Sequence, residues 1–170
     1  MMTGQARKIH IIGSVGSGKT TLARKLSEQL GILHIELDNV VWKRGPNGDI
    51  RRTIVERDSV LHKILETEDW IIEGAHFGWV AASFEQADLI ILLDTNWRVR
   101  TYRIIRRFCL QRFGSEQANY KPTFHMLRKM FRWSADFDRQ HRTEILNSLH
   151  QYGDKVIVAA TDRDIRSISG

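Results

Sequence analysis

Cysteine and proline are scarce in this chain of 170 residues, which contains one cysteine, Cys109, and two prolines. A single cysteine cannot form a disulfide within the chain, so a small secreted fold held together by disulfides is excluded. The sequence also lacks low-complexity tracts and internal repeats, which indicates an ordered globular protein. We interpret Cys109 as a packing residue on a helix face.

Long apolar runs are missing as well. The first residues, MMTGQARK, are polar, and no later stretch approaches the ~18 consecutive apolar residues of a membrane helix. The sequence therefore predicts neither a signal peptide nor a membrane span, and we expect a cytoplasmic protein that does not bind membranes. Its length predicts a single domain over residues 1–170.

Acidic residues are almost absent from one segment, residues 98–133. This segment contains ten Lys or Arg and one acid, Glu116, whereas the rest of the chain contains 16 basic and 19 acidic residues. The net charge of +6 therefore belongs to one segment and not to the whole surface. Such a segment fits a polyanion, which is either a nucleic acid or a nucleotide bound elsewhere in the same protein.

Short apolar strands alternate with helices along the chain. The apolar pattern predicts strands at residues 8–13, 33–37, 70–74, 88–94 and 155–160. It predicts helices at residues 19–30, 51–66, from 96 to a break near 114, from 122 to about 150, and at the end, with a loop at 43–49. This alternation is typical of an α/β fold, a parallel sheet covered by helices on both faces in three α/β/α layers. Ligands bind such sheets at the carboxyl ends of the strands.

The sequence GSVGSGKTT, residues 13–21, matches the phosphate-loop motif G-x-x-x-x-G-K-[ST] between a strand and an amphipathic helix. Its glycines let backbone N–H groups point at phosphate oxygens, Lys19 reaches the β- and γ-phosphates, and the Thr20 hydroxyl binds Mg²⁺. We therefore predict ATP and Mg²⁺ as cofactors. The residues predicted to bind ATP are those of the phosphate loop, Gly13, Ser14, Val15, Gly16, Ser17, Gly18, Lys19, Thr20 and Thr21.

Two carboxylates that follow strands are candidates for the metal and for the acceptor. Asp94 closes the run DLIILLD, and we expect it to bind the metal together with Thr20, while an N-cap of the next helix is a compatible alternative. Asp38 follows the second strand, and we predict that it acts in catalysis, either on Mg²⁺ through water or on the acceptor hydroxyl; a loop cap is the alternative. Because the histidines and Cys109 show no metal-ligand spacing, nucleotide-bound Mg²⁺ is the metal expected.

The phosphate loop, IIEG, ADLIILLD and the arginine-rich segment together resemble the adenylate-kinase-like group of P-loop kinases. More closely, ELDNVVWKRG, DWIIEGAHFGW, RVRTYRIIRR and YKPTFHMLRKMFRW resemble bacterial proteins labelled DNA topology modulation protein, FlaR type. The kinase resemblance implies a sheet of order 2-3-1-4-5, an acceptor-binding region at about residues 38–66, and a helical lid at about residues 98–133. The four-cysteine zinc site of some kinase lids and the AMP-site signature are not reproduced, so the acceptor stays open.

The arginines of the predicted lid are the remaining catalytic candidates. At 100° per residue, Arg100, Arg103 and Arg107 share one helix face. We predict that Arg103 and Arg107 stabilise charge on the transferred phosphoryl group and that Arg106 or Arg107 stacks on the adenine. A solvated charged face, or a surface for single-stranded nucleic acid, is the alternative. The opposing arc is predicted to be apolar and packed, and it contains Tyr102, Ile104, Ile105, Phe108 and Cys109.

These features predict an ATP-dependent phosphotransferase that moves the γ-phosphoryl group to a nucleoside monophosphate or another small acceptor. A nucleotide-binding regulator that associates with DNA is the alternative. Candidates for the acceptor side follow the second or third strand, and they are Trp42, Lys43, Arg44, Arg52, Arg57, Glu73, His76, Phe77 and Trp79.

Overall fold

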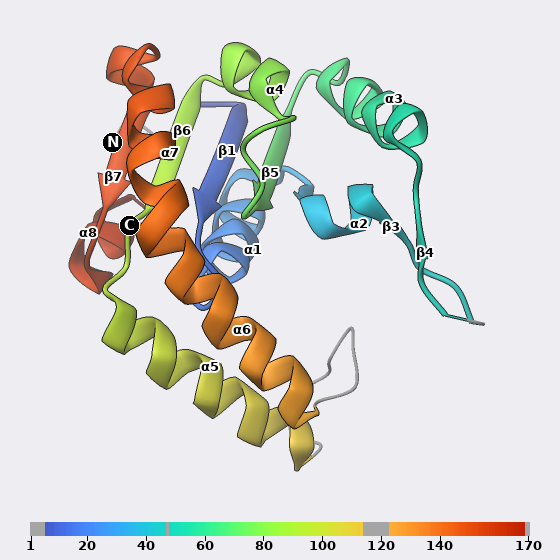
Figure 1. Ribbon diagram of the computed structural model, residues 1–170. Coiled ribbons are helices and arrows are strands. Elements are labelled where there is room, and N and C mark those ends of the chain that lie inside the picture. The colour runs from blue at the N-terminus through green and yellow to red at the C-terminus, as the bar shows by residue number, and fades with distance from the viewer. Residues whose placement is uncertain (1–5, 47, 114–122, 169–170) are drawn as a thin grey trace.

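A five-stranded parallel sheet forms the centre of the protein in a computed structural model that describes residues 6–46, 48–113 and 123–168. The strand order is β2-β5-β1-β6-β7, which confirms the predicted order 2-3-1-4-5 of the main strands (Figure 1). The strands are β1 (Lys8–Gly13), β2 (His34–Glu36), β5 (Trp70–Gly74), β6 (Leu89–Leu93) and β7 (Val156–Ala159).

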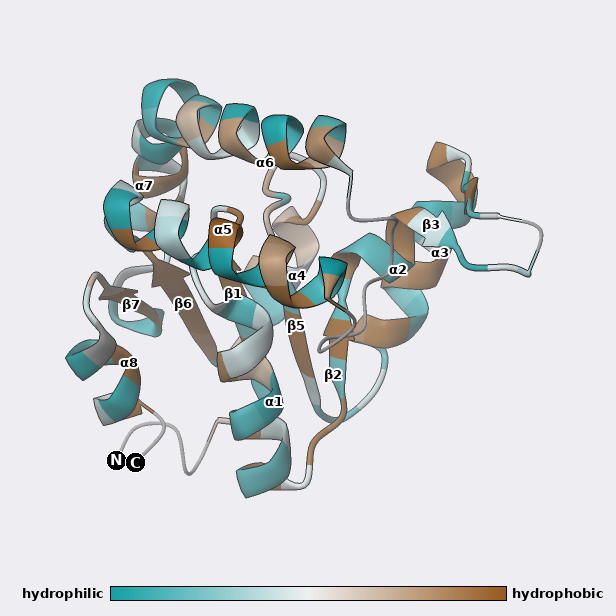
Figure 2. Cartoon of the chain, turned by 90° about the horizontal axis from the view of Figure 1, so that it is seen from below, coloured by the Kyte–Doolittle hydropathy of each residue, from teal (hydrophilic) through white to brown (hydrophobic). Residues whose placement is uncertain are grey.

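The three inner strands, β5, β1 and β6, are buried almost throughout. Figure 2 shows β5 and β6 as hydrophobic ribbons among helices that carry both hydrophilic and hydrophobic residues. A strand with helices on both faces needs apolar side chains in both directions, so its sequence is a continuous apolar run. This is why the central strands could be located from the sequence.

Helices cover both faces of the sheet and complete the three layers. On one face, α1 (Lys19–Leu30) and α8 (Asp162–Ile168) pack through Leu22, Leu26 and Ile168. On the other face, α3 (Ile54–Leu65), α4 (Ala81–Gln86) and α7 (Arg142–His150) pack through Leu61, Phe84 and Leu149. The predicted α/β/α architecture is confirmed.

The region after β2 differs from the prediction. The strand ends at Glu36, and Leu37, whose side chain is completely buried in the core, begins a short helix, α2 (Leu37–Val41). The loop predicted at residues 43–49 instead connects the two strands of an antiparallel pair, β3 (Trp42–Lys43) and β4 (Ile50–Arg51), and shares Lys43 with the first of them. Helix α3 starts later than predicted because Thr53 caps it, and the Thr53 amide donates to Glu56 Oε2 at 2.8 Å.

The helical segment after β6 forms a long pair. Helices α5 (Trp97–Arg112) and α6 (Phe124–Asp136) lie side by side and extend beyond the sheet (Figure 1). A π-helical turn, η1 (Phe137–His141), joins α6 to α7, and a 3-10 turn, η2 (Gly153–Lys155), precedes β7. The helix predicted from residue 122 to 150 is therefore divided, and the break predicted near residue 114 lies outside the described residues. Within the described ranges, no helix is both long enough and apolar enough to cross a membrane.

Candidate active site

The phosphate loop curls between β1 and α1 as its glycines allow. Gly16 has φ 76° and Gly18 has φ 102°, a left-handed conformation that favours glycine. A Cβ atom on Gly13 would lie 2.8 Å from the carbonyl oxygen of Leu93, so this position also requires glycine. The Lys19 ammonium folds back over the loop and donates to the Ser14 carbonyl at 2.8 Å.

The residues of this loop fit a phosphate chain. The hydroxyl oxygens of Ser14 and Ser17 are buried and have no hydrogen-bond partner. Helix α1 starts at Lys19 with no acid in its first turn, so its positive dipole end is not neutralised. Two unsatisfied hydroxyls, a helix N-terminus and a lysine form an anion-binding surface.

Glu73 supplies the carboxylate nearest to Thr20. It lies on β5, paired in register with Ile11 of β1, and only 4% of its surface is exposed. The Thr20 hydroxyl donates to Glu73 Oε1 at 2.6 Å. Burial raises the pKa of Glu73, and the charge of Lys19 and the Thr20 hydrogen bond oppose that shift. The sequence analysis named Glu73 only as an acceptor-side candidate, although it lies near the carboxyl end of a central strand, as Asp94 does.

Asp94 pairs with Arg142 in this structure, and its role beside the metal stays a prediction. Arg142, the first residue of α7, binds it with a two-pronged ion pair: Nε lies 2.8 Å from Oδ1 and Nη2 lies 2.7 Å from Oδ2. The alternative role predicted for Asp94, the N-cap of the next helix, is wrong. The cap of α5 is Asn96, whose Oδ1 accepts from the Arg98 amide at 2.9 Å.

Asp38 lies in the first turn of α2, near His76 and Lys19. Its Oδ1 is 3.5 Å from Nε2 of His76. The hydrogen bond from His76 lowers the pKa of Asp38, and the charges of His76, Lys19 and Arg44 add to the effect. Burial lowers the pKa of Lys19, whereas the charges of Glu73 and Asp38 raise it. The ends of β2 and β5 thus bring two carboxylates to the phosphate-loop lysine.

Helix α5 brings two predicted arginines to the same place. Nη1 of Arg103 donates to the Ser17 carbonyl at 2.8 Å, and it would lie 3.1 Å from a Cβ on Gly18. The charge of Arg107 acts on Lys19 and lowers its pKa. Arg106 is exposed on α5.

Arg100 is not part of an open cationic face. Only 1% of it is exposed, and it donates to the Ser134 hydroxyl at 3.1 Å and to Asp138. The helix face that carries Arg100 is packed, while Tyr102 and Ile105 of the predicted apolar arc are 66% and 46% exposed. A buried guanidinium is tolerated because these acceptors satisfy it.

The acceptor-side arginines all lie near α2 and α3. Arg44 pairs with Asp49, and Arg52 donates to the Asn39 carbonyl at 2.7 Å. The guanidinium carbon of Arg57 lies 4.2 Å from the ring centre of Trp79. Arg57 also pairs with Asp58.

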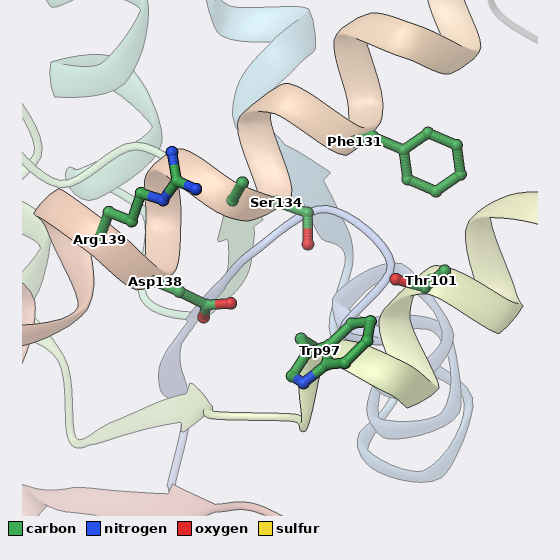
Figure 3. A pocket seen from close by; sticks show the side chains of 7 residues that line it. Trp97, Thr101, Phe131, Ser134, Asp138 and Arg139 are labelled. Atoms are coloured by element: carbon green, nitrogen blue, oxygen red, sulfur yellow. The ribbon is translucent and has the colours of Figure 1, made fainter.

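A separate pocket of about 220 Å³ lies between α5 and the α6–η1 junction (Figure 3). The side chains of Trp97, Thr101 and Asp138 border this space, and none of the predicted site residues lines it. Within the described part of the chain, no group of three or more His, Cys, Asp or Glu side chains is arranged to hold a metal ion. The full lining is Trp97, Thr101, Phe131, Ser134, Ala135, Asp138 and Arg139.

Comparison with known proteins identifies the family. A family model described as AAA domain (AAA_33) matches residues 9–112, from β1 to the end of α5. The chain belongs to the AAA_33 family. The matched stretch of this AAA_33 protein contains the phosphate loop, Asp38, Glu73, Asp94 and the arginines of α5.

Similar proteins include kinases with a phosphate loop. The chain is 29% identical over 147 residues to the uncharacterized protein YqaC of Bacillus subtilis (strain 168), covering 86% of this chain and 81% of that protein. It is 31% identical over 111 residues to a cytidylate kinase of Pyrococcus furiosus, covering 58% of this chain and 56% of that protein. Thus the chain spans little more than half the length of that kinase.

Solved structures support the fold assignment. A shikimate kinase from Acinetobacter baumannii in complex with shikimate has a TM-score of 0.54 at 16% identity, covering 98% of this chain and 90% of that one. A shikimate kinase from Bacteroides thetaiotaomicron has a TM-score of 0.52, also at 16% identity, covering 96% of this chain and 94% of that one. The AAA_33 protein therefore has the fold of a P-loop kinase of small molecules.

Proposed function

We propose that this AAA_33 protein is a phosphotransferase that uses ATP and Mg²⁺ and moves the γ-phosphoryl group to a small-molecule acceptor. The observation that carries the proposal is the arrangement around the phosphate loop, where Lys19 donates to the Ser14 carbonyl at 2.8 Å and Thr20 donates to Glu73 at 2.6 Å. Asp38 lies close enough for its charge to raise the pKa of Lys19. A phosphoryl-transfer site needs this combination of a phosphate-binding cation, a metal-side carboxylate and an acceptor-side group.

The nucleotide and the metal are assigned to the phosphate loop and its neighbour Glu73. The backbone of residues 13–21 would hold the phosphates, and Thr20 would bind Mg²⁺, which neutralises charge on the β- and γ-phosphates. Because Glu73 already accepts a hydrogen bond from Thr20, we place it beside the metal, in the role predicted for Asp94. Glu73 would orient a metal-bound water or the Thr20 hydroxyl.

Arg103 and Arg107 are proposed to stabilise charge on the transferred group. Arg103 already contacts the Ser17 carbonyl, and the charge of Arg107 reaches Lys19. Preorganised cations in such positions act where negative charge develops. Movement of α5 relative to the loop would release Arg103 to the phosphates.

The relatives support a kinase, and their names include different acceptors. Several are called cytidylate kinase and others are called shikimate kinase. The proposed acceptor is therefore either a nucleoside monophosphate or another small molecule.

Replacement of the phosphate-loop lysine tests the proposal. Lys19→Ala should lower phosphotransfer at saturating ATP by roughly 10²–10³-fold, because the transition state loses a preorganised cation. Lys63→Ala, on the exposed surface of α3, is the matched control and should leave turnover unchanged. ADP formation in the presence of Mg²⁺ is the measurement. Equal turnover in Lys19→Ala and in the unchanged protein would contradict the proposal.

A further inference from the structure

The acceptor side of the site is rich in carboxylates. Glu36 and Glu73 are partners in the register of β2 and β5, and Asp38 follows two residues after Glu36. All three carboxylates therefore lie at the carboxyl ends of two neighbouring parallel strands. An acceptor that carries a phosphate would bring further negative charge to this place.

The nearby arginines already have partners within the protein. Arg44 pairs with Asp49, Arg57 pairs with Asp58 and lies over Trp79, and Arg52 donates to the carbonyls of Asn39 and Val40. Tight phosphate recognition uses guanidinium groups whose paired N–H donors point at the ligand. These three arginines use guanidinium N–H donors in contacts within α2, the β3–β4 pair and α3.

Asp38 has the opposite character, because it is an accessible hydrogen-bond acceptor. About 69% of its side chain is exposed, while its Oδ1 faces Nε2 of His76. The His76 ring lies 5.5 Å from the Trp79 ring, which limits its orientation. Asp38 is thus fixed on one oxygen by His76 and open on the other.

We infer that the acceptor is a hydroxyl compound without a phosphate group, and that Asp38 receives the proton of that hydroxyl while His76 holds Asp38 in position. This inference rests on the proposed function. The acceptor oxygen forms a bond to the γ-phosphorus, the bond from that phosphorus to the β,γ-bridging oxygen breaks, and ADP leaves. The proton passes from the acceptor oxygen to an Asp38 oxygen, so atoms and charge balance without another reactant.

The first test compares water with nucleoside monophosphates. Water is the simplest hydroxyl acceptor, and nucleoside monophosphates are acceptors that carry the phosphate group excluded by the inference. ADP release is measured with ATP and Mg²⁺ in water alone, with AMP, CMP, GMP or UMP, and with a panel of sugars, polyols and hydroxy acids. We expect Asp38→Asn to slow ADP release in water, and with any active hydroxyl compound, by about 10²-fold, with unchanged binding of a non-hydrolysable ATP analogue. Glu66→Gln is the control, since Glu66 also pairs with a histidine, His62, at 3.3 Å, but on the exposed surface of α3.

The outcomes separate the inference from the proposed function. Phosphorylation of any of the four nucleoside monophosphates, detected by ³¹P NMR, would overturn the inference and leave the proposed function standing. An Asp38→Asn protein as active as the unchanged one would do the same. No ATP turnover in the unchanged protein, in water or with any acceptor, would overturn the proposed function together with the inference.

His76 is a positioning residue, and its test depends on rescue. His76→Phe should lower kcat by about tenfold without changing KM for ATP, because a hydrogen bond to a charged group is lost. His76→Gln retains a side-chain N–H donor and should restore most of kcat. A smaller loss in His76→Phe than in His76→Gln would mean that the ring only fills space, and the assignment of His76 would fail.

Discussion

His10 lies in β1 and is completely buried beside Phe84. Its Nδ1 is 2.8 Å from the Ser83 hydroxyl, which itself donates to the Val80 carbonyl at 2.7 Å. Because the single hydroxyl proton of Ser83 is used by Val80, Nδ1 of His10 must carry a proton and donate. Nε2 has no partner, and burial lowers the pKa of His10 to about 3. The imidazole is therefore neutral inside the folded protein.

The stability of the protein should fall in mild acid because of His10. The pKa of His10 is about 3 in the folded protein, whereas its ordinary value, which we assign to the unfolded chain, is 6.5. Below pH 6.5 the unfolded chain therefore binds a proton at His10 that the folded protein does not bind. The His10 contribution to the free energy of unfolding should drop by about 2 kcal/mol from pH 7 to pH 5. Urea unfolding of the unchanged protein and of His10→Asn, which keeps an N–H donor, measures this. Parallel pH curves for the two proteins would refute the assignment.

Glu73 and Asp94 give opposite predictions for the metal. Glu73→Gln should raise the Mg²⁺ concentration needed for half-maximal turnover by about 10–100-fold, because the group next to Thr20 loses its charge. Asp94→Asn should leave that concentration unchanged and lower the free energy of unfolding by about 1 kcal/mol, since it weakens the partly exposed pair with Arg142. Mg²⁺ titrations of ATP turnover and urea unfolding separate the two roles. A Mg²⁺ effect at Asp94 alone would restore its original assignment.

At the scale of elements, Arg100 joins α5 to the end of α6 and to η1. Its partners Ser134 and Asp138 belong to those two elements, and its own carbonyl oxygen would lie 2.9 Å from a Cβ on Gly16. One residue thus contacts the phosphate loop through its backbone and the second helix through its side chain. The position of α5, which carries Arg103, depends on this junction.

Arg100→Met should destabilise the protein by about 3 kcal/mol, because Ser134 and Asp138 lose a buried charged donor. Arg106→Met, on the exposed side of the same helix, should change the free energy of unfolding by less than about 0.5 kcal/mol. Urea denaturation measures both. If the two variants lower the free energy of unfolding by similar amounts, helix propensity and not the contacts of Arg100 with Ser134 and Asp138 would explain the decrease.

The sequence predicted elements well where one physical signal dominates. The central strands are apolar because both faces are buried, and the phosphate loop has a fixed glycine pattern. The short α4, the β3–β4 pair and the π-helical turn have no such signal, since each depends on packing against distant residues. Arg100 is the clearest case, because its partner Asp138 lies 38 positions away. The Thr53–Glu56 cap, by contrast, was readable in the sequence and would have placed the start of α3.

At the scale of the whole molecule, the basic surplus is divided between the inside and the surface. Arg100 is buried and Arg103 donates to the phosphate loop, whereas Arg128, Lys129 and Arg132 are exposed on α6. Trp133, which follows this row, is 52% exposed. A row of cations beside an exposed aromatic ring keeps the nucleic-acid alternative open as a hypothesis.

Salt dependence distinguishes the alternatives. If the protein acts only on small molecules, a single-stranded oligonucleotide should bind weakly, and raising salt from 50 to 200 mM should abolish binding. The triple variant Arg128→Gln, Lys129→Gln, Arg132→Gln should leave ATP turnover unchanged. Fluorescence anisotropy of a labelled oligonucleotide is the measurement. Tight binding that survives 200 mM salt in the unchanged protein and disappears in the triple variant would favour the DNA-associated regulator.

The ion pair between Asp94 and Arg142 joins two points that are 48 positions apart in the chain. Helices α5 and α6 lie between these points, so the chain leaves the core at the end of β6 and returns beside it at the start of α7. The entropic cost of closing such a loop grows only with the logarithm of its length, by about 0.6 kcal/mol for each doubling. A change in the number of residues between Asp94 and Arg142 therefore alters the closure entropy of this long loop only slightly.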